Sequence, residues 1–220
     1  MKITLEQALK FTLKWEGNFT DHPNDLGGPT NKGIIQTVYD KYRTERDLHK
    51  RSVQFITDSE VNDIYEKYYW EPIRAKWLQA PLALVLFDTA VNFGVSGAIR
   101  RLQKSLNIKI TGQWTQEISD NIHQADALKI ALDICKLRIA WRYQRVRINT
   151  SQKVFLRGWL NRDNDLIKTI SNIKPFTAMN DEDLIDIIID YAIDNIEVIE
   201  DNYEESLINI LNELSQEDSR

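Results

Sequence analysis

One glutamate stands where a helix is expected to end, and a loop rich in glycine and aspartate follows it. The stretch reads KWEGNFTDHPNDLGGPTNKGI, with Glu16 just before Gly17. Glu16 comes eleven residues after Leu5, so a helix places the two side chains about 20° apart. Partial burial at the end of this apolar face favours a protonated carboxyl. Glu16 could therefore protonate a glycosidic oxygen; the alternative is a buried acid paired with a neighbouring arginine.

The loop after Glu16 offers a second carboxylate. Asp25 lies in its glycine-rich part, and Asp21 is an equally simple candidate. A loop carboxylate across a cleft from a helix-borne glutamate is typical of hydrolases that use two carboxylates. The alternative is an aspartate that forms the turn by accepting a hydrogen bond from its own backbone.

Polar and aromatic residues further along could complete a site. Asp88 interrupts an apolar helical pattern, and Asn92 shares its face four residues on. A buried aspartate is rare unless it is paired or functional, so the pair could bind substrate or form a hydrogen-bonding node behind the site. Tyr69 and Trp70 could stack on sugar faces, or they could belong to the core.

Other chemistries find little support. The three histidines, His22, His49 and His123, show no metal-ligand spacing with acids or with Cys135, so we expect neither a metal nor another cofactor. No nucleophile elbow, phosphate loop or dinucleotide fingerprint is present. The arginines of an expected helix over about 125–147 could touch phosphates, but no nucleic-acid motif accompanies them, and we expect no nucleic-acid partner.

The elements that must position these residues are mainly helical. Thr4 and Gln7 form a capping-box pattern at the start of the first helix, and Thr57 or Asp58 caps a second. Pro81 suits the first turn of an apolar, buried helix. Further helices are expected over 97–108 and about 125–147, and FLRGWLNRDNDLIKTI (155–170) closes this region. We predict three regions, namely a catalytic lobe (1–80), a second helical lobe packed with it (81–174) and a helical tail (175–220).

The tail differs sharply in charge from the body. Residues 175–220 hold 14 of the 33 acidic residues but one of the 28 basic residues. The basic body suits a polyanionic partner. Apolar residues at steps of three and four over 181–214 predict an amphipathic helix, which could dock on the body, self-associate or bind a partner.

The chain shows no targeting signal by composition. Glu6 and Gln7 interrupt what would be the apolar core of a secretory leader, and no run approaches the roughly 18 apolar residues that span a bilayer. We expect synthesis in the cytoplasm without membrane insertion, and delivery by another agent to any target outside.

Five blocks of the sequence resemble one known family. EGNFTDHPNDLGGPTNKGI is similar to the signature of glycoside hydrolase family 108, the N-acetylmuramidase-like lysozymes. IYEKYYW, LFDTAVNFG, LQKSLNI and FLRGWLNR resemble further family blocks in the expected order, over about residues 3–170. The later blocks resemble the peptidoglycan-binding segment of such enzymes.

The resemblance implies a lysozyme-like helical fold with a short, turn-rich active-site segment and, in this chain, an extra acidic C-terminal helix. It implies cleavage of the β-1,4 bond between N-acetylmuramic acid and N-acetylglucosamine in peptidoglycan. Glu16 matches the family's essential acid, and Asp25 maps to the motif aspartate. Thr30 and Asn31 in the same motif are candidates for substrate binding.

Departures from the family motif define the alternative function. Asn18 replaces a glycine, Leu26 a proline and Ile35 a threonine whose hydroxyl could bond substrate or a catalytic group. The alternative is a catalytically weakened peptidoglycan-binding protein, or an accessory of wall assembly or export. Either protein would reach the wall through a holin or a dedicated export system.

Overall fold

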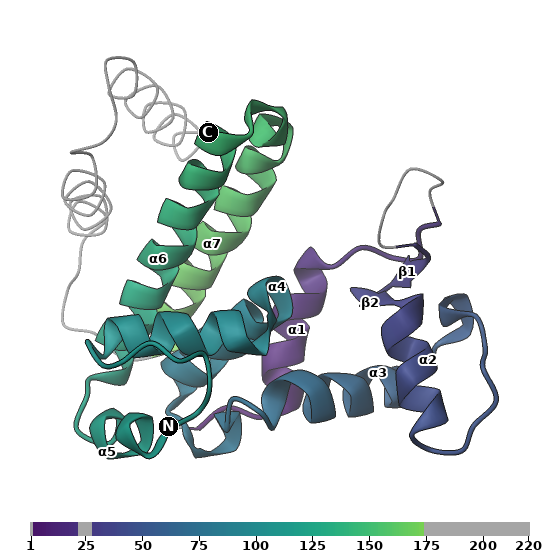
Figure 1. Ribbon diagram of the computed structural model, residues 1–220, viewed down its shortest axis with the longest axis horizontal. Helices are drawn as coiled ribbons and strands as arrows, with labels where there is room; N and C mark the ends of the chain where they lie inside the picture. Colours follow the sequence, from purple (N-terminus) through teal and green to yellow (C-terminus); the bar gives the residue numbers. More distant parts are fainter. Residues whose placement is uncertain (1, 22–27, 174–220) are drawn as a thin grey trace. The chain divides into compact units, whose positions relative to one another are not determined.

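The computed structural model describes residues 2–21 and 28–173, which are mainly helical, as the sequence predicts (Figure 1). The helices of this part are α1 (Leu5–Trp15), α2 (Gln36–Thr44), α3 (Asp58–Tyr65), α4 (Ala80–Ser105), α5 (Gln116–Ile122), α6 (Ala127–Ile148) and α7 (Lys153–Ile173). Strands β1 (Thr30–Asn31) and β2 (Ile34–Ile35) form an antiparallel hairpin. Short helical turns are η1 (Val53–Phe55), η2 (Glu66–Trp70), η3 (Ala75–Trp77) and η4 (Thr150–Gln152).

Capping boxes fix the starts of α1 and α3; the first was predicted as a box and the second as a simple cap. The Thr4 hydroxyl accepts from the Gln7 amide while the Gln7 side chain accepts from the Thr4 amide. Thr57 and Glu60 repeat this exchange at α3, which settles the choice between Thr57 and Asp58. Each box satisfies backbone donors that the first turn of a helix leaves unpaired.

Helix α4 joins two segments that the sequence predicts as separate helices. Its first turn contains Pro81, as expected, and its backbone departs from helical geometry at Gly94, where φ is 73°. By length and composition α4 is apolar enough to cross a membrane, contrary to the expectation from sequence. Most of its apolar window is buried inside the protein, however, and the helix carries a fully buried aspartate, Asp88. We therefore interpret α4 as the central core helix.

The remaining long helices pack around α4. Helices α6 and α7, which the η4 turn connects, run side by side, and α4 contacts both of them as well as α1 (Figure 1). The buried side chains of α4 include Leu82, Leu86 and Phe87, all fully enclosed. This packing brings α7, near the end of the described chain, against the site at the end of α1.

Residues 1–176 group into one compact unit. The predicted division of the body at residues 80 and 81 stays a prediction. The predicted tail helix over 175–220, its stripe over 181–214 and the candidate Asp25 lie outside the described residues.

The single cysteine offers a probe of this core. Cys135 on α6 is fully buried, and burial raises the pKa of its thiol to about 12. We expect a chromogenic thiol reagent to label the native protein at least about 100-fold more slowly than the denatured protein, because attack requires the core to open. A Cys135→Ala variant should give no signal. Rapid labelling of the native protein would contradict this packing.

Candidate active site at the end of helix α1

Glu16 lies where the chain leaves α1. It is the C-cap residue, with an extended backbone (φ −88°, ψ 138°), and 20% of its side chain is exposed. Its Oε1 accepts a hydrogen bond of 2.9 Å from Nη1 of Arg162 on α7. The carboxyl group is therefore reachable from solvent, and the arginine of the alternative interpretation is present.

Arg162 holds two carboxylates at once. Its Nη2 and Nε donate to Oδ1 and Oδ2 of Asp88 at 2.7 and 3.2 Å, while Nη1 serves Glu16. Asp88 also accepts from the Thr12 hydroxyl at 3.0 Å and lies 2.9 Å from Nη2 of Arg138. Both oxygens of Asp88 are engaged and its side chain is fully buried, as the alternative of a hydrogen-bonding node behind the site requires. Asp88 could therefore affect a ligand only indirectly, through Arg162.

The charge network continues away from Glu16. Arg138 contacts Asp163 at 2.6 Å, and Nε of Arg142 donates to the same carboxylate at 3.2 Å. Arg138 is fully buried and Arg142 nearly so, which excludes these two from contact with phosphates, whereas Arg145 and Arg147 on the same helix are exposed. Burial opposes the charge of Asp88, but Arg138 and Arg162 outweigh it and hold the pKa of Asp88 below its usual range.

Asn92 belongs to the edge of the same network. Its side-chain amide donates to the Asp88 carbonyl at 3.1 Å, and its Oδ1 accepts from Arg142 at 3.4 Å. Asn92 is half-buried, so its predicted contact with substrate stays a prediction.

The hairpin closes the other side of Glu16. Gly33, at the turn between β1 and β2, has φ 75°, and a Cβ added there would lie 2.8 Å from Glu16 Oε2 and 2.6 Å from the Tyr65 hydroxyl. The Tyr65 hydroxyl donates to the Lys32 carbonyl at 2.8 Å. The Lys32 amide donates to the Gly17 carbonyl at 3.1 Å. Glycine is needed at position 33 because the Glu16 carboxyl group occupies the space of a side chain.

Two predicted binding residues of the hairpin have structural partners. The Asn31 amide group donates to the carbonyls of Val53 and Gln54, both at 3.2 Å, and ties β1 to η1. The hydroxyl of Thr30 donates to the Gly28 carbonyl at 3.0 Å. Asn31 is buried and Thr30 half-buried, so their predicted role in substrate binding stays a prediction.

The departures from the family motif have local explanations. Ile35 is the N-cap residue of α2 and supplies no side-chain cap, so a threonine there would accept from the first turn of that helix. The motif threonine thus has a structural use apart from chemistry. Asn18 is exposed and its φ is not positive, so the glycine it replaces was not required for backbone freedom. Leu26 lies outside the described residues.

Of the two predicted stacking aromatics, one faces the site. Tyr69 and Trp70 lie on η2, a π-helical turn that follows α3, and such turns are frequent at functional sites. Tyr69 is half-buried, and burial together with the charge of Glu16 raises the pKa of its hydroxyl. Trp70 is buried and packs edge-on against Phe87 at 5.4 Å, which leaves no ring face for a sugar.

Sequence reasoning missed the contribution of α7. Besides Arg162, Asp165 accepts from Lys14 Nζ at 2.9 Å and from Trp15 Nε1 at 2.8 Å. Residues 162 and 165 share one face of α7, and together they hold residues 14 and 15 of α1 and its C-cap, Glu16. The sequence signal for this contribution was a basic residue followed three positions later by an acidic residue in an amphipathic helix. Many surface helices show the same pattern, so it did not indicate a site.

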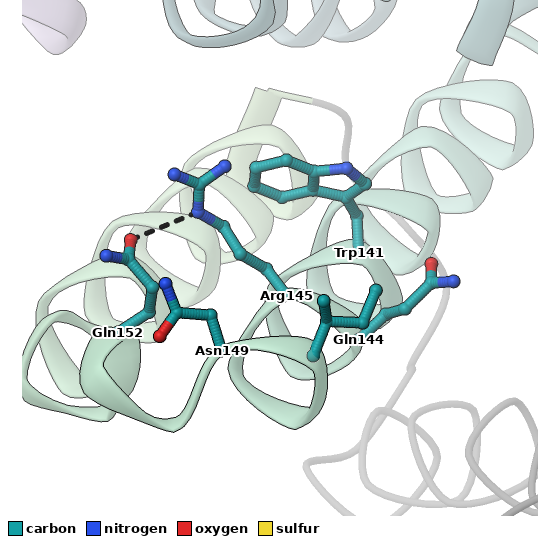
Figure 2. Close-up of a pocket in the computed structure, with 6 residues that line it drawn as sticks. Trp141, Gln144, Arg145, Asn149 and Gln152 are labelled. Carbon is teal, nitrogen blue, oxygen red and sulfur yellow. Dashed lines mark hydrogen bonds between the residues drawn. The ribbon is translucent and has the colours of Figure 1, made fainter.

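A separate hollow of about 420 Å³ lies at the far end of α6 (Figure 2). Trp141, Arg145 and Gln152 line it, together with Gln144, Ile148 and Asn149. Arg145 donates to Gln152 across it at 3.1 Å. The lining contains no carboxyl group, so this hollow cannot supply an acid. Among the described residues, no cluster of three potential metal ligands occurs.

Comparison with known proteins agrees with this arrangement. Residues 9–94 match the family model of glycosyl hydrolase 108, which confirms the predicted resemblance over that stretch. The structure of SagA from Brucella abortus is similar with a TM-score of 0.67 and 24% sequence identity, over 80% of this chain and 98% of that one. That likeness shows a shared fold, and the predicted lysozyme-like helical class is confirmed. No curated protein matches this chain.

The contact between Gly33 and Glu16 gives a direct test. We expect Gly33→Ala to destabilise the protein and to displace the Glu16 carboxyl group, because the methyl group and Oε2 cannot share the space. Gly28→Ala is a matched control, since Gly28 has a similar φ of 70° but nothing within 4 Å. Backbone strain of about 1–2 kcal/mol should be common to both variants. Equal urea denaturation curves for the two would refute the contact.

The charge of Asp88 gives a pH-dependent prediction. A carboxylate whose pKa is depressed by folding adds stability above its unfolded pKa and loses it as pH falls through the folded pKa. At neutral pH we expect Asp88→Asn to cost roughly 3–5 kcal/mol, because it leaves two buried arginines short of a partner. Below about pH 4 the difference should shrink, because the aspartate of the unfolded chain is protonated first and folded Asp88 takes up its proton only at lower pH. Urea denaturation at several pH values measures it, and a constant difference would contradict the ionised node.

Proposed function

We propose, from the match of residues 9–94 to the glycosyl hydrolase 108 family, that this protein hydrolyses peptidoglycan. The bond is the β-1,4 linkage between N-acetylmuramic acid and N-acetylglucosamine, and Glu16 is the general acid. One observation carries the proposal. Within the matched segment, Glu16 is partly exposed at the end of α1 and is fixed from two sides by Arg162 and Gly33.

In this proposal the two oxygens of Glu16 have separate tasks. A carboxylic acid with its proton on Oε2 keeps Oε1 as an acceptor, so the Arg162 bond survives protonation. Oε2 then gives its proton to the bridging oxygen while the bond from that oxygen to the anomeric carbon breaks. The bonding electron pair stays with the leaving oxygen, and Glu16 becomes a carboxylate beside a guanidinium.

One water molecule completes the hydrolysis. It adds to the anomeric carbon and loses a proton to a base, for which Asp25 is the candidate proposed from sequence and Asp21 the alternative. Asp21 is exposed at the start of the loop. Because the substrate is the cell wall, we propose that the protein acts there after delivery by a holin or a dedicated export system.

The test is release of reducing ends from purified sacculi, with analysis of the muropeptides. We expect Glu16→Gln to lower the rate by about 10²–10⁴-fold, the usual contribution of a general acid. Glutamine keeps an Oε1 acceptor for Arg162. The melting temperature and the binding to sacculi should therefore stay close to those of the wild-type protein. Asp21→Asn and Asp25→Asn, assayed in parallel, identify the second carboxylate by the larger loss.

Each contrary result has a distinct meaning. Full activity of Glu16→Gln would reject Glu16 as the acid. Sacculus binding by the wild-type protein without release of reducing ends would favour the non-catalytic wall-binding or accessory function. Release from chitin oligomers but not from sacculi would move the substrate to chitin.

A further inference from the structure

We infer that Arg162 is a positioning residue for Glu16, so that helix α7 completes a site whose acid lies in the first segment of the chain. The inference rests on the proposed function. It extends the site beyond residues 9–94, the stretch that the family model matches. Three features of the described residues carry it: the geometry of the guanidinium, its burial and a second fastening from the same helix.

The guanidinium of Arg162 is itself fixed. Two of its nitrogens bind Asp88 as a fork, at 2.7 and 3.2 Å, and Asp88 is fully buried. Because the guanidinium group is planar and rigid, its two bonds to Asp88 also fix the position of the third nitrogen, Nη1. Nη1 lies 2.9 Å from Glu16 Oε1. The position of the Glu16 carboxyl group is thus set from the core of α4 through Arg162.

Burial makes this contact stronger than a surface ion pair. The Arg162 side chain is 8% exposed and that of Glu16 is 20% exposed. Water screens such a pair less than it screens charges on the surface. The contact strengthens as Glu16 becomes negative during proton transfer, so Arg162 favours the transition state over the ground state.

A second fastening from α7 fixes the backbone that carries Glu16. Asp165, one turn beyond Arg162, binds Lys14 and Trp15. Glu16 is the point where α1 gives way to an extended chain, so its position depends on contacts outside the helix. The two anchors hold residues 14–16 as a unit against α7.

The other groups around Glu16 cannot replace this function. Tyr65 and Tyr69 approach from the α3 and η2 side, and burial, followed by the charge of Glu16, raises the pKa of both hydroxyls. Both are therefore neutral near neutral pH. Lys14 is engaged by Asp165, and Lys32 by Asp58.

The kinetic test compares Arg162→Met and Arg162→Lys with wild type on sacculi or soluble muropeptide chains. We expect Arg162→Met to lower kcat roughly 10–100-fold with KM within about twofold, because the acid is misplaced while substrate binding is kept. The kcat of Arg162→Lys should lie between those of wild type and Arg162→Met, since one ammonium group cannot bridge both carboxylates. Wild-type kcat in Arg162→Met would overturn the inference.

Asp163→Asn is the matched control. Asp163 is the next residue of α7, is fully buried and binds Arg138 and Arg142 in the same network, but it does not touch Glu16. Its substitution should lower the melting temperature about as much as Arg162→Met and leave kcat within about threefold. Equal loss of kcat in Asp163→Asn and Arg162→Met would show a merely structural role and would also overturn the inference.

A second readout does not depend on activity. Trypsin releases residues 15–32 as one peptide, which contains Glu16 and the exposed Asp21. Carbodiimide with an amine couples to accessible carboxyl groups, and the rate at Glu16 relative to Asp21 is read by mass spectrometry. We expect this ratio to rise several-fold in Arg162→Met and not in Asp163→Asn.

The two readouts separate the two proposals. If wild type releases no reducing ends, the proposed function fails, and the labelling ratio alone decides on Arg162. An unchanged ratio in Arg162→Met would overturn the inference. If Arg162→Met does not fold, Arg162→Lys takes its place in both measurements, and wild-type values for kcat and the labelling ratio would again overturn it.

Discussion

Three arginines and three carboxylates alternate in sign through the centre of this protein, in the order Glu16, Arg162, Asp88, Arg138, Asp163 and Arg142. Each internal member contacts a neighbour of opposite charge, and the four central ones are nearly or fully buried. Burying such charges is tolerable only when each has a partner, so the three helices α4, α6 and α7 cannot shift independently of one another. Glu16 is the end of the chain of charges and its one member with substantial exposure. Through Arg162 the network thus connects the ordered core to the partly exposed carboxyl group of Glu16.

The opposite wall of the site is built by different means. A tight hairpin places Gly33 against Glu16 Oε2, and the Tyr65 hydroxyl fastens that hairpin through the Lys32 carbonyl. The left-handed backbone of Gly33 allows the close approach, and neutral tyrosines line the space beside it. Among the described residues, Glu16 therefore has a charged side that fixes one oxygen and an uncharged side that faces the other. That asymmetry is what a proton donor requires, because the two oxygens of a carboxyl group must take different roles.

Much of this arrangement follows from patterns within a few residues of each other. The caps at Thr4 and Thr57 and the proline in the first turn of α4 are local, since the groups concerned lie within about one turn of each other. The helical phase predicted for Glu16 does not hold, because α1 ends at Trp15 and Glu16 has an extended backbone. Trp70 shows the limit of such patterns. Its sequence signal is the same as that of Tyr69, but the π-helical turn directs Trp70 onto Phe87 and leaves Tyr69 beside Glu16. Two adjacent aromatic residues in a helical sequence do not by themselves predict which ring packs in the core.

By itself the sequence indicated a mainly helical protein, a family resemblance over about residues 3–170, of which residues 9–94 match the family model, and one glutamate as the predicted catalytic acid. These conclusions depend on short-range periodicity and on a contiguous motif. Only the tertiary structure decided which charges meet. Glu16 and Arg162 are 146 residues apart, and Arg162 and Asp88 are 74 apart. Ion pairs carry no periodicity in sequence, and a buried arginine reads like a surface one until its helix is packed. The partner of the acid was therefore set by how α7 docks on α1 and α4.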